Sequence, residues 1–207
     1  MITLALDTST PCGSVALLRD DEPLAEQTFP RARSADGLFD AIAAVSAGFV
    51  PNLIAVGLGP GSFTGIRAGI AAARGLALPG KTPIKGVSSF DVLALTALPQ
   101  MPPDATVLCV LADARRGEVY SGLYGRDGQP LRECRISTRE QVATEPMWVV
   151  GAEVTPSAAV LGRLARARFL ADGCRGDERL EPIYLRATEY RRCADSTGPA
   201  GAGMLAP

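Results

Sequence analysis

A carboxylate and three hydroxyl groups stand together at Asp7-Thr-Ser-Thr10, directly after an apolar run. In a turn, an aspartate can hold Mg²⁺ through water while hydroxyl and N–H groups cradle a phosphate. The same residues can form an Asx turn, in which the side chains bond to their own backbone, and taken alone this second interpretation is favoured. Asp113 follows another apolar run in the same way. The candidate nucleotide or phosphate residues are therefore Asp7, Thr8, Ser9 and Asp113.

Histidine is absent from the 207 residues. This absence excludes Ser-His-Asp and Cys-His nucleophiles, histidine metal ligands and the commonest general base near neutral pH. The five cysteines are odd in number and form no C-x-x-C pair, so neither a disulfide framework nor a structural zinc site is predicted. We expect no catalytic residue, no metal site and reduced thiols of the kind found in cytoplasmic proteins.

The formal net charge of the chain is −1. A net charge this close to zero does not indicate binding to nucleic acid or to an anionic membrane. No window holds 18 apolar residues, and the first residues lack a basic stretch and cleavage site, so we expect no membrane contact and a cytoplasmic location.

The segment Gly59-Pro-Gly-Ser-Phe-Thr-Gly-Ile-Arg67 opens a predicted helix at 63–78. It lacks the lysine of a P-loop and the spacing of a dinucleotide-binding loop, so it does not by itself predict a phosphate site. Ser62 stands where a serine side chain would cap the first turn of the helix.

Gly65, Gly69 and Ala73 recur along that helix at intervals of four, flanked by Ala68 and Ala72. Glycine inside a helix costs roughly 1 kcal/mol of stability relative to alanine. We expect this cost to be offset by the close packing of another element against the small residues. Two interpretations stay open: packing against a predicted helix at 34–49, which Ser34 would cap, or a face for a second chain. The residues concerned are Gly65, Ala68, Gly69, Ala72 and Ala73, with Leu38, Ile42 and Val45 as the apolar positions of the other helix.

Apolar runs and turn residues predict three strands and then alternating helices and strands. In the first half these elements span residues 2–7, 14–18, 24–29, 34–49, 53–58, 63–78, 83–87 and 88–98. A second group of three strands, at 105–112, 118–124 and 131–136, repeats the Asp, Gly and Pro-Leu positions of the first, which indicates an internal duplication. Further on we expect a strand at 147–150, a helix at 155–167 capped by Thr155, and a short strand at 168–171.

The Pro-rich stretch 99–104 is the natural boundary between the two halves. We therefore expect an N-terminal lobe at 1–100 and a second lobe at 101–192. Residues 193–207 are rich in Gly, Ala and Pro, and we expect a disordered tail there. This order of elements, given twice, is typical of two ribonuclease-H-like lobes.

Five motifs in the same order resemble those of the TsaB family, also called YeaZ, over about residues 1–186. They are Leu4-Ala-Leu-Asp-Thr-Ser-Thr10, Gly59-Pro-Gly-Ser-Phe-Thr-Gly-Ile-Arg67, Gly86-Val-Ser-Ser89, Asp113-Ala-Arg-Arg-Gly-Glu-Val-Tyr120 and Pro182-Ile-Tyr-Leu-Arg186. The resemblance implies the α/β fold of the actin and sugar-kinase (ASKHA) superfamily, with the second lobe reduced. It also implies a non-catalytic scaffold or activator in the complex that makes N6-threonylcarbamoyladenosine at position 37 of tRNA.

The same resemblance implies partners. They are a TsaD-like catalytic subunit, a TsaE-like ATPase and tRNA held only through the complex, with a homodimer when the chain is alone and no cofactor of its own. Two N-lobe helices would form the interface, through Leu38, Ile42, Val45, Gly65, Ala68, Gly69, Ala72 and Ala73, so that Gly69→Leu would block pairing without disturbing the fold. TsaD has a His-x-x-x-His metal site, which this sequence cannot form, and the old label of M22 glycoprotease is not supported.

One departure from the family and two alternatives remain. The family commonly has a histidine near the start of its first helix, where this sequence reads Arg33-Ser-Ala-Asp36. Arg115 and Arg116 could serve a nucleotide or RNA, or could form a solvated turn. The alternative function is an ATP- and Mg²⁺-dependent phosphotransferase or ATPase that uses Asp7 and Asp113.

Overall fold

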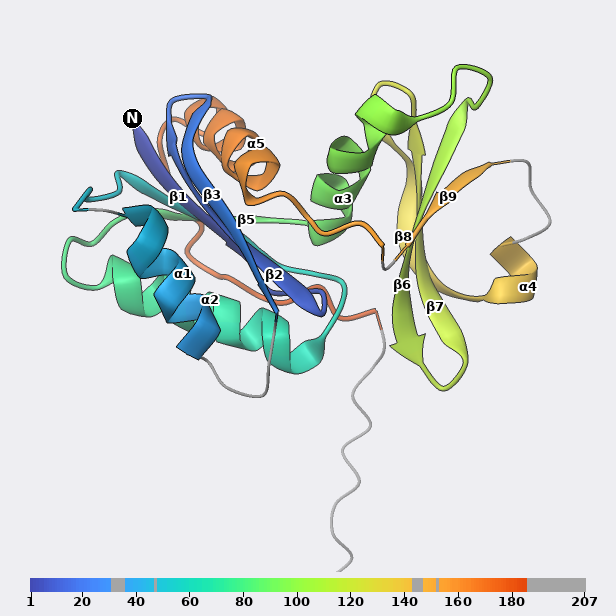
Figure 1. The fold of residues 1–207 in the computed structure, drawn as a ribbon, viewed down its shortest axis with the longest axis horizontal. Helices are drawn as coiled ribbons and strands as arrows, with labels where there is room; N and C mark the ends of the chain where they lie inside the picture. The colour runs from blue at the N-terminus through green and yellow to red at the C-terminus, as the bar shows by residue number, and fades with distance from the viewer. Residues whose placement is uncertain (31–35, 47, 143–146, 152, 186–207) are drawn as a thin grey trace, which may run out of the picture.

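A computed structural model describes residues 1–30, 36–46, 48–142, 147–151 and 153–185. The chain forms two β-sheets that stand side by side, each with helices on its faces (Figure 1). The predicted cap Ser34 and the predicted tail 193–207 lie outside the described residues.

The first sheet has the strand order β3-β2-β1-β4-β5. Its strands are β1 (Ile2–Asp7), β2 (Cys12–Arg19), β3 (Glu22–Pro30), β4 (Leu53–Gly57) and β5 (Ile84–Val87). The first three strands run antiparallel, and β4 and β5 continue the sheet in parallel from β1. Strands β1 and β4 are almost wholly buried, as expected for apolar runs covered on both faces.

The second sheet repeats this arrangement in the order β8-β7-β6-β9. Its strands are β6 (Val107–Arg115), β7 (Glu118–Gly125), β8 (Pro130–Thr138) and β9 (Trp148–Val150). As in the first sheet, three antiparallel strands are followed by one that is parallel to the first of them. The shared order and directions agree with the duplication predicted from the sequence. Within the described residues this sheet has no fifth strand.

Three helices cover the first sheet (Figure 1). Helices α1 (Asp36–Ser46) and α2 (Phe63–Ala77) lie on one face, and α5 (Ala158–Ala171) lies on the other. Helix α1 packs on β2 and β3, and α2 packs mainly on β4 and β1. Both helices contribute side chains to one core cluster on this face of the sheet, and their other sides point away from it.

The remaining helices belong to the second sheet. Helix α3 (Ser89–Ala97) packs against it through Phe90 and Leu93 and also contacts α5, and it is followed by the 3-10 turn η1 (Leu98–Gln100). The short helix α4 (Arg139–Val142) lies on the opposite face. Residue 100 therefore separates the two sheets, but the helices cross it: α3 precedes the boundary and packs on the second sheet, and α5 follows the boundary and packs on the first.

Helix α5 differs from its sequence-based prediction at both ends. It begins after Ser157, whose hydroxyl accepts from Val160 N–H at 3.3 Å, and not after Thr155. The Glu26 carboxylate, from β3, accepts from Ser157 Oγ at 2.8 Å and from Ala159 N–H at 3.1 Å. A carboxylate at this position stabilises the positive end of the helix. The strand expected at 168–171 is wrong, because Phe169 continues the buried helical face.

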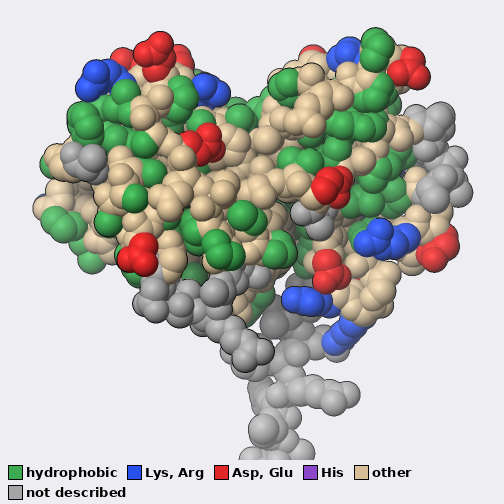
Figure 2. All heavy atoms as spheres, in the orientation of Figure 1, with side chains coloured by type: hydrophobic (Ala, Val, Ile, Leu, Met, Phe, Trp, Pro, Cys, Tyr) green, Lys and Arg blue, Asp and Glu red, His purple; other side chains and the backbone are tan. Residues whose placement is uncertain are grey.

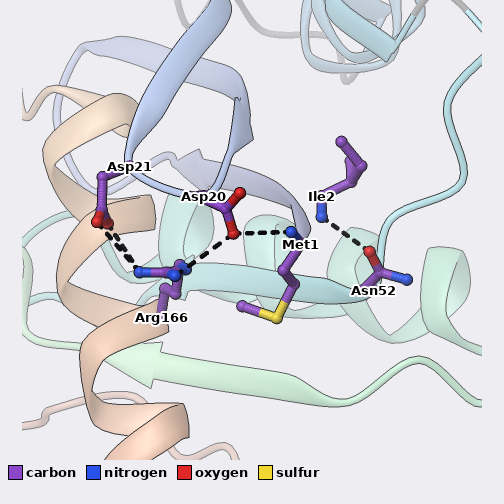
Figure 3. A network of polar contacts seen from close by, with 6 residues as sticks. All are labelled: Met1, Ile2, Asp20, Asp21, Asn52 and Arg166. Atoms are coloured by element: carbon purple, nitrogen blue, oxygen red, sulfur yellow. Dashed lines mark hydrogen bonds and ion pairs between the residues drawn. The ribbon is translucent and has the colours of Figure 1, made fainter.

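Polar contacts hold α5 to the turn between β2 and β3 (Figure 3). The Arg166 guanidinium donates to both carboxylate oxygens of Asp21 at 3.1 Å and lies 3.4 Å from Asp20. Asp20 also accepts from the N-terminal ammonium group at 2.8 Å, and Asn52 accepts from Ile2 N–H at 2.8 Å. These contacts tie the start of the chain, the hairpin turn and a helix more than 140 residues away into one unit.

The loop after α5 covers the edge strand β5. The Lys85 ammonium group contacts Asp172 and Asp177 at 2.6 Å each, and Asp177 also accepts from Gly86 N–H at 2.8 Å. Asp177 N–H donates to Ile84 C=O at 2.8 Å, as a neighbouring strand would. The two carboxylates raise the pKa of Lys85, which stays charged although it is mostly buried.

Candidate functional site

Asp7 stands at the end of β1 and points into the protein, where it is only 1% exposed. Its carboxylate accepts from Ser9 N–H at 2.8 Å, Ser9 Oγ at 2.6 Å and Ser89 Oγ at 2.6 Å. Ser89 in turn accepts from Gly59 N–H at 3.0 Å. Asp7 therefore joins the end of β1, the glycine-rich loop and the start of α3.

Burial raises the pKa of Asp7, and the three hydrogen bonds from Ser89 and Ser9 act in the opposite direction. The pocket around the carboxylate is also tight. A Cβ atom added to Gly57 would lie 2.0 Å from an Asp7 oxygen, so only glycine fits at the end of β4. The surroundings of Asp7 are those of an internal structural group.

The next two residues have similar roles. The Thr8 hydroxyl donates to Gly65 C=O in α2 at 2.7 Å, and Ser9 C=O accepts from Ser62 N–H at 2.7 Å. Both side chains are buried. Thr8 and Ser9 thus fasten the β1 turn to the start of α2, and the Asx turn that the sequence favoured at Asp7 is confirmed.

Asp113 is the counterpart of Asp7 in the second sheet. It accepts from the N–H group two residues later, Arg115 N–H at 2.8 Å, just as Asp7 does from Ser9. The environment differs: the Asp113 side chain is 64% exposed and lies 3.4 Å from the Arg115 guanidinium. Arg115 and Arg116 both adopt left-handed backbone conformations in this exposed turn, with φ of 67° and 59°.

A cleft of about 320 Å³ lies between the two lobes. Ser9 and Asp113 line it from opposite sides, together with the start of α2, but Asp7 does not reach it. The structure therefore brings Ser9 and Asp113, two of the four predicted phosphate candidates, to one cleft. Asp7 and Thr8 do not line the cleft, and the Thr8 side chain is bonded to α2. Figure 2 shows the two lobes as separate bulges.

The small-residue stripe of α2 packs on β1. A Cβ atom added to Gly69 would lie 2.4 Å from Thr8 Oγ1 in the turn after β1 and 3.6 Å from Leu6 Cδ1 in β1, and α1 is not among its nearest contacts. Seven of the eight residues predicted for a partner interface are buried inside the chain, and a buried side chain has no surface to offer a partner. These seven are Leu38, Ile42, Val45, Gly65, Gly69, Ala72 and Ala73.

The eighth residue, Ala68, is exposed. It follows that Gly69→Leu is a poor test of pairing, because leucine at this position would collide with Thr8 and disturb the fold. The large apolar residues Ile66 and Ile70 are the sequence signal that could have set the orientation of α2. They are buried beside Gly65 and Gly69 and so turn that stripe towards the core.

Replacing Gly69 by alanine should destabilise the protein, although alanine is the better helix former by about 1 kcal/mol. The added methyl group would displace Thr8 Oγ1 from its buried bond to Gly65 C=O, which costs about 1–3 kcal/mol or more. Gly75 is the matched control, because it lies in the same helix and nothing lies within 4 Å of an added Cβ atom. Urea unfolding should show Gly69→Ala less stable and Gly75→Ala more stable than the parent; equal shifts would contradict the packing described.

The exposed sides of α1 and α2 carry mainly small side chains. We define the outer face as the exposed residues Phe39, Asp40, Ala43 and Ala44 of α1 with Thr64, Ala68, Ala71 and Gly75 of α2, and the larger exposed residues Phe63, Arg67 and Arg74 of α2 border it. Figure 2 shows hydrophobic and uncharged surface with few charged side chains over the visible side of the first lobe. Small side chains let another helix approach the backbone closely, so this surface suits helix-to-helix contact.

Among the described residues there is no cluster of three or more Cys, Asp or Glu that could hold a metal ion. No described helix has the length and hydrophobicity needed to cross a membrane.

Two sheets with the same strand order, and a cleft between them, define a two-lobed α/β protein with an actin- and sugar-kinase-like fold. The family model of TsaD, described as tRNA N6-adenosine threonylcarbamoyltransferase, matches residues 45–146. Two relatives named tRNA threonylcarbamoyladenosine biosynthesis protein TsaB match most of the chain. The Escherichia coli K12 protein is 39% identical, and the match covers 90% of this chain and 95% of that protein. The Haemophilus influenzae protein is 37% identical, and the match covers 88% of this chain and 92% of that protein.

Among solved structures, YeaZ from Pseudomonas aeruginosa is similar to this chain with a TM-score of 0.75 and 28% identity, over 89% of this chain and 99% of that one. The chain belongs to the TsaB (YeaZ) family, a family of tRNA threonylcarbamoyladenosine biosynthesis proteins. The family and the fold class predicted from the sequence are confirmed.

Proposed function

We propose that this chain is an accessory subunit of the tRNA threonylcarbamoyladenosine machinery and pairs with a TsaD-like catalytic subunit through the outer face of α1 and α2. The observation that carries the proposal is this face itself. It joins two neighbouring helices, offers small side chains at Ala43, Ala68, Ala71 and Gly75, and adds Phe39, which is 51% exposed. The match of residues 45–146 to the TsaD family model supports pairing between two related folds.

The proposal includes the absence of independent catalysis. In support, Asp7 is buried and bonded to protein groups, and the sequence has no histidine for the His-x-x-x-His metal site that TsaD has. Ser9 is also buried, so within the described part of the cleft Asp113 is the only one of the four phosphate candidates that is well exposed. We further propose that a TsaE-like ATPase joins the assembly in the cytoplasm and that tRNA is bound only through the complex. We also propose that the chain forms a homodimer when alone.

Reconstitution tests this function. The chain, a TsaD-like subunit and a TsaE-like ATPase from the same organism are mixed with tRNA and the threonylcarbamoyl donor, and the modified adenosine is measured. We expect modification only when the chain and the TsaD-like subunit are both present, and no ATP turnover by the chain alone. Full modification without the chain would contradict the accessory role. Mg²⁺-dependent ATP hydrolysis by the purified chain would favour the phosphotransferase alternative.

A further inference from the structure

The segment 180–185 runs beside α2, and we call it the strap. Leu180 is buried in the core under α1 and α2, and Ile183 N–H donates to Leu58 C=O at 2.8 Å. Arg74 of α2 donates to Leu180 C=O at 3.4 Å. The strap is thus fixed along the side of α2 that faces β4 and β5, on the border of the outer face.

At the start of α2 the strap meets a cluster of aromatic and cationic groups. The rings of Phe63 and Tyr184 stack with centroids 5.4 Å apart, and the Arg67 guanidinium lies 3.9 Å above the Phe63 ring. Arg67 Nε also donates to Tyr184 Oη at 2.8 Å. Phe63 and Tyr184 remain 45% and 42% exposed, so this ordered cluster presents a large part of its area to solvent. Such side chains are enriched among the residues that dominate protein interfaces.

Two cations border the outer face, and among the described residues no carboxylate lies within ion-pair distance of either. Arg67 and Arg74 stand seven residues apart, two turns of α2, and therefore point in similar directions. Both are exposed, and in the part of the chain that the structure describes neither forms an ion pair. By contrast, Arg166 and Arg168 of α5 each contact a carboxylate of the chain. Two arginines without an ion-pair partner, next to a face of small side chains, predict that the protein bound to this face carries acidic groups opposite them.

Resting on the proposed function, we propose that the docking surface extends from the outer face onto the strap, and that the partner presents carboxylate side chains to Arg67 and Arg74. The tyrosine and phenylalanine rings hold Arg67 in place before the partner arrives, which reduces the entropy lost on binding. The small residues set how closely the helices approach, and the two arginines set the orientation and accelerate the encounter.

The test measures association of this chain with the TsaD-like subunit at several salt concentrations. The double variant Arg67→Gln/Arg74→Gln should bind about tenfold more weakly at about 0.05 M salt, mainly through slower association, because charges at the border of an interface act on the encounter. At about 0.5 M salt, where charges are screened, its affinity should come within about twofold of the parent. The pair Arg67→Lys/Arg74→Lys keeps both charges and should retain most of the association rate.

Arg116→Gln is the matched control, because it removes an exposed arginine from the second lobe and should leave binding unchanged. If the parent chain binds and the glutamine pair shows the same affinity and salt dependence, the charge complementarity proposed here is wrong while the pairing stands. An equal loss in the lysine pair would also overturn it. If the parent does not bind at all, the proposed function fails and this inference fails with it.

Discussion

Replacing Ala71 by arginine should abolish pairing with the TsaD-like subunit while the chain stays folded. Ala71 is exposed on α2 between Ala68 and Gly75, in the part of the outer face where another helix would approach most closely. An arginine there would hold the two backbones apart and bury a charge without a partner, so the affinity should fall by about a hundredfold or more. Arginine is a good helix former, so α2 itself is not expected to weaken.

Ala167→Arg is the control for this change. Ala167 is also an exposed helical alanine, but it lies in α5 on the opposite face of the first sheet. Calorimetric titration with the TsaD-like subunit should show parent-like affinity for Ala167→Arg and no measurable binding for Ala71→Arg, with equal thermal stability. Tight binding by Ala71→Arg would place the interface elsewhere.

Replacing Asp7 by alanine should cost about 2–4 kcal/mol of unfolding free energy. Ser9 N–H, Ser9 Oγ and Ser89 Oγ would lose their shared acceptor in a buried site, and each buried group left without a partner costs about 1–3 kcal/mol. Part of this loss is offset because burial disfavours the charged form of the Asp7 carboxyl group, as its raised pKa indicates. Asp113→Ala is the matched control, since the same turn is exposed there and the change should cost under about 0.5 kcal/mol.

The same aspartate should make stability depend on pH. Burial raises the pKa of Asp7 in the folded protein, whereas an unfolded aspartate has a pKa of about 3.9. Between these two values the folded state holds a proton that the unfolded state has released, so stability falls as the pH rises through this window. Asp7→Asn cannot ionise and should lack this fall. Urea unfolding at a series of pH values measures the difference, and parallel curves for the two proteins would contradict the burial of the carboxylate.

The sequence predicted the sheets well because their signals are local. Strands β1 and β4 are short apolar runs that end in turn residues, and the repeated Asp, Gly and Pro-Leu positions pointed to the second group of strands. Ser62 as the N-cap of α2 is confirmed by its bond from Gly65 N–H at 3.3 Å. Such signals depend on neighbouring residues and need no knowledge of the tertiary structure.

The position of α5 could not be obtained in this way. Its start is fixed partly by Glu26, which is more than 130 residues away in sequence and caps the helix from β3. The crossing of α3 and α5 between the two sheets likewise depends on contacts that no local pattern records. The different environments of Asp7 and Asp113 arise in the same manner, because equivalent turns are covered in one lobe and open in the other.

The sequence analysis placed the proposed partner face on residues that the structure shows to lie on the inner sides of α1 and α2. Helix α2 carries two stripes of small residues, Gly65/Gly69/Ala73 and Thr64/Ala68/Ala71/Gly75. Their spacing alone does not show which stripe is buried and which is exposed. The structure separates the two stripes, because the first packs on Thr8 and β1 and the second faces solvent. Gly69 in the first stripe is required by packing within the chain, so it says nothing about a second chain.

Hydrogen exchange of this chain, measured with and without the TsaD-like subunit, tests the central claim most directly. Because the outer face is proposed to be covered in the complex, exchange should slow in residues 39–46 and 63–78 and stay unchanged in strands β6 to β8. Slower exchange confined to the second sheet, with α1 and α2 unaffected, would contradict a docking surface on these two helices.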